Sequence, residues 1–291
     1  MDDVTKGHAA RVRAVDPLLA DQDELPVGDG QLIDAPDAAG VTRVERLDPG
    51  DMQSLWGPLV VSHLKARVAG ADPEVALGGL LDRWTGLADE AMDVWWPSRD
   101  TAPVRALAVR GFAPTTVLAV GRPRPVDAPA VTIRRADDLD VLAPMYEALV
   151  AYDAQFGWVT TRARTTELLR AHLADAVLPR EWCWLAEVAG RPAGFAVVSP
   201  PDAAGWIASV VDDAPVAYFG AMYVDPSARG RGVGAALVRV AHERAAAEGV
   251  SAMLLHHALP NPHSTPFWAR QGYRPLLTQW ARHPQGRPRA R

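Results

Sequence analysis

Residues 222–234 read MYVDPSARGRGVG, and this stretch decides the fold. The apolar run that opens it is typical of a strand, which the Asp-Pro pair ends because proline restricts the residue before it. Three glycines then alternate with Arg229, Arg231 and Val233, and an amphipathic helical pattern covers 233–248. Glycines permit a tight turn whose N–H groups converge at a helix N-terminus, where an anion is favoured. The stretch therefore predicts a turn that binds a diphosphate.

Other anion-binding turns fit these glycines less well. A dinucleotide-binding turn requires Gly-x-Gly-x-x-Gly, whereas Gly230, Gly232 and Gly234 stand at every second position. A P-loop requires a Lys followed by Ser or Thr, and no such pair follows Gly234. A plain strand-to-helix turn, or a nucleotide- or phosphate-binding module of another kind, stays open as an alternative at this point.

The chain outward from this turn alternates predicted strands and helices, which indicates a layered α/β domain. The expected strands are 131–135, 182–187, 195–198, 218–224, 252–257 and 273–281, and the expected helices are 138–151, 161–176, 233–248 and 264–270, with a turn at 189–192. Residues 122–130 hold three prolines, which neither a helix nor a central strand accepts. We therefore predict two domains, at 1–124 and 131–284, and a disordered basic tail at 285–291.

Composition excludes several other classes of protein. The net charge of −5 argues against a nucleic-acid binder, which would show a strongly basic face. The single cysteine, Cys183, excludes a disulfide framework and cysteine-rich zinc sites, and its strand pattern favours a buried structural thiol over a nucleophile. The N-terminus lacks a signal-peptide core, and no apolar run is long enough to span a membrane. We expect a cytoplasmic protein without a metal.

The N-terminal half reads as a second, degenerate copy of the C-terminal half. Gly111 and Pro114 precede Gly272 and Pro275 by the same offset, and each pair is followed by a predicted strand. Asp48-Pro49 similarly matches Asp225-Pro226, but the residues after Asp48-Pro49 hold Asp51 and no arginine. A diphosphate would be repelled there. We therefore expect an N-terminal copy without a phosphate-binding turn.

The C-terminal half resembles the GNAT (Gcn5-related N-acetyltransferase) superfamily. Its pyrophosphate loop reads Arg/Gln-x-x-Gly-x-Gly/Ala, which Arg229, Gly232 and Gly234 match, and Asn261, Phe267, Trp268, Gly272 and Tyr273 follow in the family's order. The resemblance covers about residues 131–284. It implies a mixed sheet that splays between the strands ending near Val224 and His257, and a tandem arrangement with the degenerate copy.

The resemblance also implies a binding site for acetyl-CoA. The expected cofactor-binding residues are Met222, Tyr223, Val224, Arg229, Gly230, Arg231, Gly232, Val233, Gly234, Ala235, Asn261 and Trp268. The pantetheine arm is expected at Met222 and Val224, and the pyrophosphate on the amides of 229–235. Asn261 equally suits a helix cap, which would stabilise the fold without any chemistry.

The catalytic groups are less well marked than the loop. The family often uses a Tyr as proton donor four residues before the Gly, and Trp268 stands at that position, whose indole N–H is not an acid. His256 and His257 end a strand and point in opposite directions, so only one faces the cofactor. We expect His257 as the base, because a histidine relays protons near neutral pH, and Tyr218 as a hydrogen-bond partner of the amine or of a water.

These features predict an N-acetyltransferase that moves an acetyl group from acetyl-CoA to a primary amine by direct attack in a ternary complex. The acidic net charge favours a cationic acceptor. The expected partners are acetyl-CoA and an amine, on a small molecule or a protein, with a homodimer left open. The alternative is a non-catalytic acyl-CoA-binding or sensor protein, which the missing tyrosine at position 268 favours.

Overall fold

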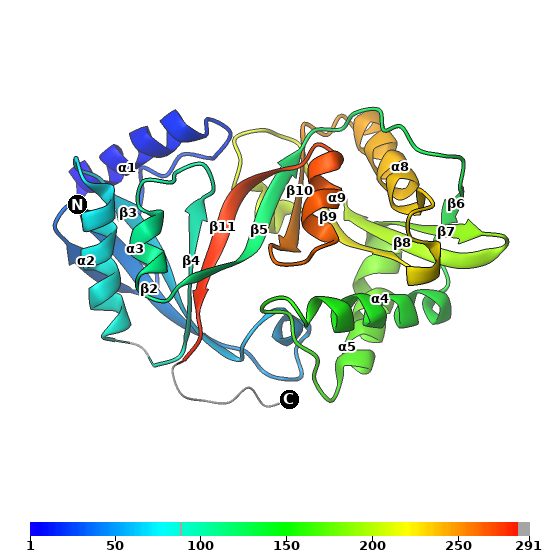
Figure 1. The fold of residues 1–291 in the computed structure, drawn as a ribbon, viewed down its shortest axis with the longest axis horizontal. Coiled ribbons are helices and arrows are strands. Elements are labelled where there is room, and N and C mark those ends of the chain that lie inside the picture. The colour runs from blue at the N-terminus through cyan, green and yellow to red at the C-terminus, as the bar shows by residue number, and fades with distance from the viewer. Residues whose placement is uncertain (88, 285–291) are drawn as a thin grey trace. The chain divides into compact units, whose positions relative to one another are not determined.

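The chain forms two compact units that are not contiguous in sequence (Figure 1). The computed structural model describes residues 1–87 and 89–284. Unit 1 comprises residues 1–48, 58–117 and the C-terminal segment from Pro275, and unit 2 comprises 49–57 and 118–274. The sequence had divided the chain once, between 124 and 131. The units differ from that division because the last strand of the chain belongs to unit 1. The predicted tail at 285–291 lies outside the described residues.

Unit 2 is a mixed sheet in which one parallel pair follows an antiparallel series. Its strands are β6 (Thr132–Arg135), β7 (Trp182–Val188), β8 (Arg191–Ser199), β9 (Val216–Val224) and β10 (Ala252–Ala258). Neighbours from β6 to β9 are antiparallel, and β10 is parallel to β9. A parallel neighbour requires a crossover connection, which the helix between β9 and β10 supplies.

Helices cover both faces of this sheet (Figure 1). They are α4 (Leu139–Asp153), α5 (Thr165–His172), α6 (Leu178–Arg180), α7 (Gly205–Ala208), α8 (Val233–Ala247) and α9 (Ser264–Arg270). α4 and α5 bury apolar side chains against β7, β8 and β9, including the fully buried Phe195. α8 crosses the opposite face, where Val233 and Leu237 lie next to Gly194 of β8. These helices hold both walls of the site described below.

Unit 1 repeats part of this plan. Its strands are β1 (Gln31–Ala35), β2 (Ala38–Arg46), β3 (Val60–Val68), β4 (Ala91–Pro97) and β11 (Arg274–Arg282), and its helices are α1 (Asp2–Val15), α2 (Pro73–Thr85) and α3 (Val104–Ala108). β1, β2 and β3 are antiparallel neighbours, and β4 is parallel to β3 through the crossover helix α2. β11 completes the unit as an antiparallel partner of β4. β5 (Ala113–Gly121) begins in unit 1 and ends in unit 2.

The segment 49–57 belongs to unit 2, where the side chain of Arg162 binds two of its carbonyl groups. Arg162 donates from Nε to the Ser54 carbonyl and from a terminal nitrogen to the Gly57 carbonyl, each at 2.8 Å. Asp48-Pro49 lies between β2 and β3, whereas Asp225-Pro226 lies between β9 and the crossover helix α8, so the expected equivalence of the two pairs is wrong. The helix of unit 1 that joins two parallel strands, as α8 does in unit 2, is α2.

Most predicted elements of the C-terminal half form, and one is divided. The turn at 189–192 joins β7 to β8, with Ala189 and Gly190 at φ 51° and 71°. The helix expected at 161–176 instead begins at Thr165 and passes into a π-helical turn at Leu173–Val177. None of the helices in the described part of the chain combines the length and apolar character that a membrane span requires.

Candidate acetyl-donor site

The glycine turn before α8 is a cradle of backbone N–H groups. Gly230 and Gly232 have φ of 73° and 79°, in the left-handed region that favours glycine, and Gly232 is the N-cap of α8. The first hydrogen bond of the helix runs from Ala236 N–H to the Gly232 carbonyl at 3.0 Å. The N–H groups of the first turn, at Val233, Gly234 and Ala235, therefore lie outside the helical ladder, where they can bind an anion.

The two parallel strands beside this turn pair only at their beginnings. The register joins Ala252 to Val216, Met253 to Ala217 and Leu254 to Tyr218, and no pair beyond Tyr218 is formed between them within the described residues. β9 nevertheless continues to Val224 and β10 to Ala258. The strands thus separate over their second halves, which leaves backbone groups of β9 free of the parallel ladder.

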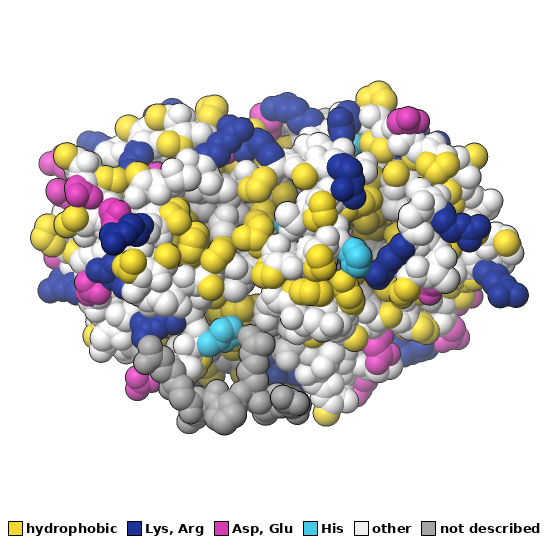
Figure 2. Space-filling view, viewed as in Figure 1, with side chains coloured by type: hydrophobic (Ala, Val, Ile, Leu, Met, Phe, Trp, Pro, Cys, Tyr) yellow, Lys and Arg dark blue, Asp and Glu magenta, His cyan; other side chains and the backbone are white. Residues whose placement is uncertain are grey.

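A cavity of about 410 Å³ occupies the space between this turn, β9, α4 and α9. Eleven of the twelve cofactor-binding residues expected from the sequence line it, namely Met222, Tyr223, Val224, Arg229, Gly230, Gly232, Val233, Gly234, Ala235, Asn261 and Trp268. Arg231, the twelfth, is exposed and lies outside the lining. Basic side chains and a histidine lie among apolar side chains at the surface over α4, α8 and α9 (Figure 2).

Arg229 is held at the rim of the cavity by contacts that leave its charge unpaired by any carboxylate among the described residues. Its Nε donates to the Val224 carbonyl at 3.3 Å, and its guanidinium lies 5.3 Å from the centre of the Tyr152 ring. The Tyr152 ring in turn stacks on His263 at 5.8 Å. A guanidinium fixed in this way supplies positive charge to an anion without first having to break an ion pair.

Asn261 is buried, and both polar atoms of its side chain form hydrogen bonds. Its Oδ1 accepts hydrogen bonds from the backbone N–H of His263 at 2.9 Å and of Ser264 at 3.2 Å, and its Nδ2 donates to Asp153 Oδ1 at 3.0 Å. Asn261 therefore caps the start of α9 and ties that start to the end of α4. The capping role is the one that the structure assigns to it, and a cofactor contact remains a prediction.

Replacing Asn261 with alanine should destabilise the protein by about 2–4 kcal/mol, because three hydrogen bonds at a buried position are lost together. Urea denaturation of the variant and the unchanged chain measures this difference. Ser264→Ala is the control, since it keeps the backbone N–H that Asn261 caps. An equal stability of the Asn261 variant and the unchanged chain contradicts the capping role.

Asp153 is a carboxylate in an unfavourable place. It is the last residue of α4, where the helix dipole disfavours negative charge, and it lines the cavity. Burial raises the pKa of its carboxyl to about 6, and the hydrogen bond from Asn261 offsets part of that rise. The carboxyl therefore exchanges its proton close to neutral pH.

The structure brings Tyr218 to His256 and not to His257. The Tyr218 hydroxyl lies 2.9 Å from His256 Nδ1, and the Trp206 ring lies 4.9 Å from the Tyr218 ring. Burial lowers the pKa of His256 to about 4, with a smaller effect of His257, and burial raises the pKa of Tyr218 well above its usual value. Near pH 7 both groups are thus neutral hydrogen-bonding groups.

His257, which the sequence favoured as the base, faces the start of α9. Its Nδ1 lies 3.3 Å from the Ala258 carbonyl oxygen and 3.4 Å from Thr265 Oγ1. Burial lowers the pKa of this imidazole as well. Among the described residues, neither His257 nor Tyr218 lines the cavity. Both catalytic assignments therefore stay predictions.

Trp268 is buried in an aromatic cluster. Its ring makes edge contacts with Phe219, Phe267 and Tyr273 at 5.1, 5.1 and 5.2 Å between ring centres. The indole packs α9 against β9 while one side of it lines the cavity. This packing explains a large apolar ring at the position where the family often has a tyrosine.

Unit 1 has no counterpart of the N–H cradle within its described residues. The N-terminus of α2 is capped by Asp72, whose Oδ1 accepts from Val75 N–H at 3.1 Å, with Pro73 and Glu74 in the first turn. This end of the helix is therefore already bound to a carboxylate and carries further negative charge. A diphosphate is disfavoured there for the same reason that it is favoured at α8.

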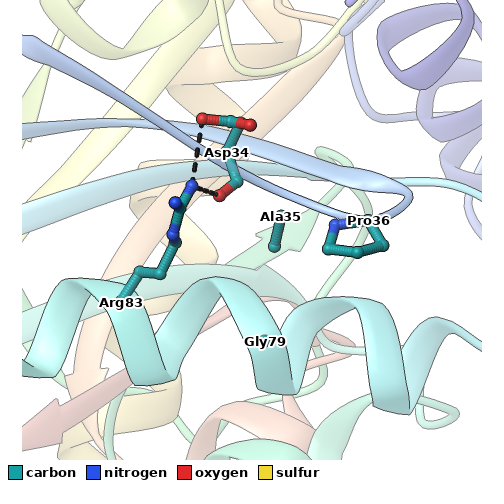
Figure 3. Close-up of a pocket in the computed structure, with 5 residues that line it drawn as sticks. All are labelled: Asp34, Ala35, Pro36, Gly79 and Arg83. Atoms are coloured by element: carbon teal, nitrogen blue, oxygen red, sulfur yellow. Dashed lines mark hydrogen bonds and ion pairs between the residues drawn. The ribbon is translucent and has the colours of Figure 1, made fainter.

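A second hollow lies in unit 1, beside α2 and the end of β1 (Figure 3). Of the residues that line this hollow, Arg83 is the one with a cationic side chain. Its guanidinium donates hydrogen bonds to the Asp34 carbonyl and, at 3.1 Å, to Asp34 Oδ1. The guanidinium is thus paired with a neighbouring carboxylate. This hollow therefore lacks the available positive charge that distinguishes the cavity of unit 2.

The segment that forms this cavity matches a known protein family. Residues 145–273 match the acetyltransferase (GNAT) family. The matched segment begins within α4 and ends just after α9, so it contains the glycine turn, both separating strands and the cavity lining. No curated protein sequence matches the chain. Among the described residues, no cluster of three or more potential ligands is arranged to hold a metal ion.

Solved GNAT structures resemble the chain at low sequence identity. A GCN5-related N-acetyltransferase from Sphaerobacter thermophilus has a TM-score of 0.58 at 15% identity, over 96% of this chain and 90% of its own. One from Kribbella flavida has a TM-score of 0.49 at 16% identity, over 97% of each chain. An aminoglycoside N-acetyltransferase in complex with CoA has a TM-score of 0.42 at 19% identity, over 58% of this chain and 99% of its own. The Sphaerobacter thermophilus structure thus resembles the fold of this chain over nearly its whole length.

Several residues of the lining were absent from the set expected for the cofactor. Leu149 and Tyr152 come from α4, and His263, Ser264, Arg270 and Gln271 come from the segment around α9. Tyr152 lies far from Arg229 in sequence, so no local pattern could have paired them. The resemblance places Asp153 with the first helix, which helps line the acceptor cleft in the family, and a solvated helix end explains it equally well; the structure puts it in the cavity lining, in contact with Asn261.

Proposed function

We propose that this protein is an N-acetyltransferase that uses acetyl-CoA to acetylate a primary amine. The observation that supports this most is the cavity in which the N–H cradle of α8, Arg229 and the separated end of β9 meet. A diphosphate suits the cradle, and an extended pantetheine arm suits the edge of β9 that does not pair with β10 beyond Tyr218. The GNAT match over the same residues supports the same donor.

We propose that the acceptor amine lies near Tyr218 and His256. Their neutral hydrogen-bonding pair can orient an amine, and Trp206, which is 62% exposed, adds an aromatic surface next to it. Residues 199–218 hold Asp202, Asp212 and Asp213 and no Lys or Arg, and of the three aspartates Asp213 is paired with Arg122. This charge favours a cationic amine. For the partner of Tyr218, the 2.9 Å contact favours His256 over His257.

Tyr218→Phe should raise the KM for the amine about 10-fold and leave the affinity for acetyl-CoA unchanged, because it removes one hydrogen bond to the acceptor. Steady-state kinetics with a fixed concentration of acetyl-CoA measures this. Tyr223→Phe is a matched control on the same strand. A loss of acetyl-CoA affinity in Tyr218→Phe, with an unchanged amine KM, contradicts the placement of the acceptor.

We also propose that unit 1 descends from a second copy of the same domain. In both units, an antiparallel series leads to a parallel pair joined by one crossover helix, α2 in unit 1 and α8 in unit 2. The carboxylate cap of α2 supports the loss of any donor site in unit 1. A cytoplasmic location and a homodimer remain predictions from the sequence.

The proposed activity is tested by the release of CoA thiol from acetyl-CoA in the presence of amines. A suitable panel contains n-butylamine, tyramine, spermidine and glucosamine, together with a peptide that has a free N-terminus. We expect release that depends on at least one amine, with the acetylated amine found by mass spectrometry. Tight acetyl-CoA binding with no turnover on any amine supports the non-catalytic sensor instead.

A further inference from the structure

The carboxyl of Asp153 accepts a hydrogen bond from Asn261, but its negative charge does not help the cavity to bind a phosphorylated donor. It lines the cavity that holds the N–H cradle, and a carboxylate repels phosphates. It also stands at the C-terminal end of α4, where the helix dipole penalises negative charge. A charged side chain in an electrostatically unfavourable position of this kind is expected at a functional site.

The orientation of this carboxyl is fixed by a donor that is itself fixed. Asn261 Oδ1 accepts from two backbone N–H groups, so the amide group cannot turn over without losing both bonds. Its Nδ2 must then point at Asp153 Oδ1, at 3.0 Å. One carboxyl oxygen is thus held by Asn261, in a residue that lines the cavity.

We propose that Asp153 is the catalytic residue that moves the proton during acetyl transfer, with Asn261 as its positioning residue. This inference rests on the proposed function. It gives the proton-transfer role to Asp153 in place of His257, whose Nδ1 faces Ala258 and Thr265. It also supplies an acid in a site where Trp268 stands at the position that the family often gives to tyrosine.

The step is balanced within the ternary complex. The lone pair of the neutral amine forms the C–N bond at the thioester carbonyl, and the carbonyl π electrons move to oxygen. The ionised Asp153 takes one proton from the nitrogen. As the carbonyl re-forms, the C–S bond breaks and the same proton passes from Asp153 to the sulfur, which leaves as CoA thiol. The products are the acetamide and CoA thiol, and the carboxylate is regenerated.

The chemistry of the carboxyl suits this role better than that of the histidines. A proton carrier works best when its pKa lies near the working pH. The pKa of Asp153 is raised to about 6, whereas that of His256 is lowered to about 4. A neutral His256 holds a proton too weakly to carry one at pH 7. It can instead keep Tyr218 in place.

The decisive variant is Asp153→Asn, which has the same shape and cannot ionise. We expect kcat to fall about 100-fold or more, as for the loss of a general acid–base group, with an acetyl-CoA Kd that is unchanged or lower. The melting temperature should be unchanged or higher, because a charge is removed from the end of α4. A purely structural role would spare kcat, because the amide oxygen of the new side chain can still accept the hydrogen bond from Asn261. Asp140→Asn, an 83% exposed carboxylate on the same helix, is the matched control and should retain full kcat.

The pH profile gives a second readout. With saturating acetyl-CoA, kcat/KM for the amine should rise with pH through a pKa of about 6 or somewhat above, since the carboxyl must be ionised and the bound phosphates raise its pKa further. Asp153→Asn should lack this rise. Asn261→Ala should move it to higher pH, because the lost hydrogen bond favours the ionised form. The other titratable or charged side chains that line the cavity are Tyr152, Tyr223, Arg229, His263 and Arg270.

His263→Asn and His257→Gln test whether a histidine, and not Asp153, gives the rise with pH. Both variants should keep the rise near pH 6. If the unchanged protein turns over and Asp153→Asn equals it, or if either histidine variant abolishes the rise, the assignment of Asp153 is overturned while the proposed function stands. If the unchanged protein binds acetyl-CoA but acetylates no amine, the proposed function fails and the role of Asp153 fails with it.

Discussion

Ala235→Asp should weaken acetyl-CoA binding by about 100-fold or more while leaving the protein folded and at least as stable as before. Ala235 is the third residue of α8 and lines the cavity beside the free N–H groups. A carboxylate there lies where a phosphate is expected. Two like charges about 4 Å apart repel by about 4 kcal/mol near a protein surface, and each 1.4 kcal/mol is tenfold in Kd.

The same substitution is expected to help the helix, which separates binding from folding. An acidic residue in the first turn stabilises a helix by about 0.3–1 kcal/mol, and α8 has no acidic residue there. Ala235→Asn is the matched control, because it adds nearly the same volume without charge. Isothermal titration gives the Kd values, and thermal unfolding gives the stability. Equal acetyl-CoA affinities of the Asp and Asn variants contradict the placement of the phosphates.

Gly232→Ala should destabilise the protein far more than Gly230→Ala, although the two glycines have nearly the same φ. A Cβ atom at position 232 would lie 2.1 Å from Cγ of Pro129, whereas at 230 no described atom lies within 4 Å. Each substitution costs about 1–2 kcal/mol for the left-handed backbone. The overlap with Pro129 adds about 1–3 kcal/mol at position 232, so its total reaches about 2–5 kcal/mol.

Urea denaturation of the two variants measures this difference, and a double variant identifies its cause. Pro129→Gly combined with Gly232→Ala should recover most of the extra loss, because the overlapping ring is gone. The close approach of Pro129 also shows why a substitution at Gly232 is a poor test of phosphate binding alone. Equal stabilities of the Gly230 and Gly232 variants contradict the packing of Pro129 on the turn.

The sequence predicted the parts of this site that are local. The alternation of glycine and arginine at 229–234 predicted the turn, because glycine is the residue that most readily adopts a left-handed backbone conformation. The helix at 264–270 was predicted with its observed bounds. Asn261 was expected either as a cap or as a cofactor contact, and the hydrogen bonds to His263 and Ser264 bear out the cap.

The remaining features depend on contacts between distant segments, which a single sequence does not encode locally. Arg229 meets Tyr152, and Asn261 meets Asp153, across more than 70 residues in each pair. The pairing of Tyr218 with His256 depends on where the parallel register of β9 and β10 begins. The place of β11 in unit 1 depends on its pairing with β4, far away in sequence.

The central claim is that the cavity beside the glycine turn binds acetyl-CoA through its diphosphate and pantetheine arm. Isothermal titration of the unmodified protein with acetyl-CoA, and separately with CoA and ATP, tests it most directly. We predict one site per chain, with a Kd of about 1–100 μM for acetyl-CoA and CoA, typical of a metabolic co-substrate, and at least tenfold weaker binding of ATP. Failure of acetyl-CoA to bind, or an equal affinity for ATP, contradicts the claim.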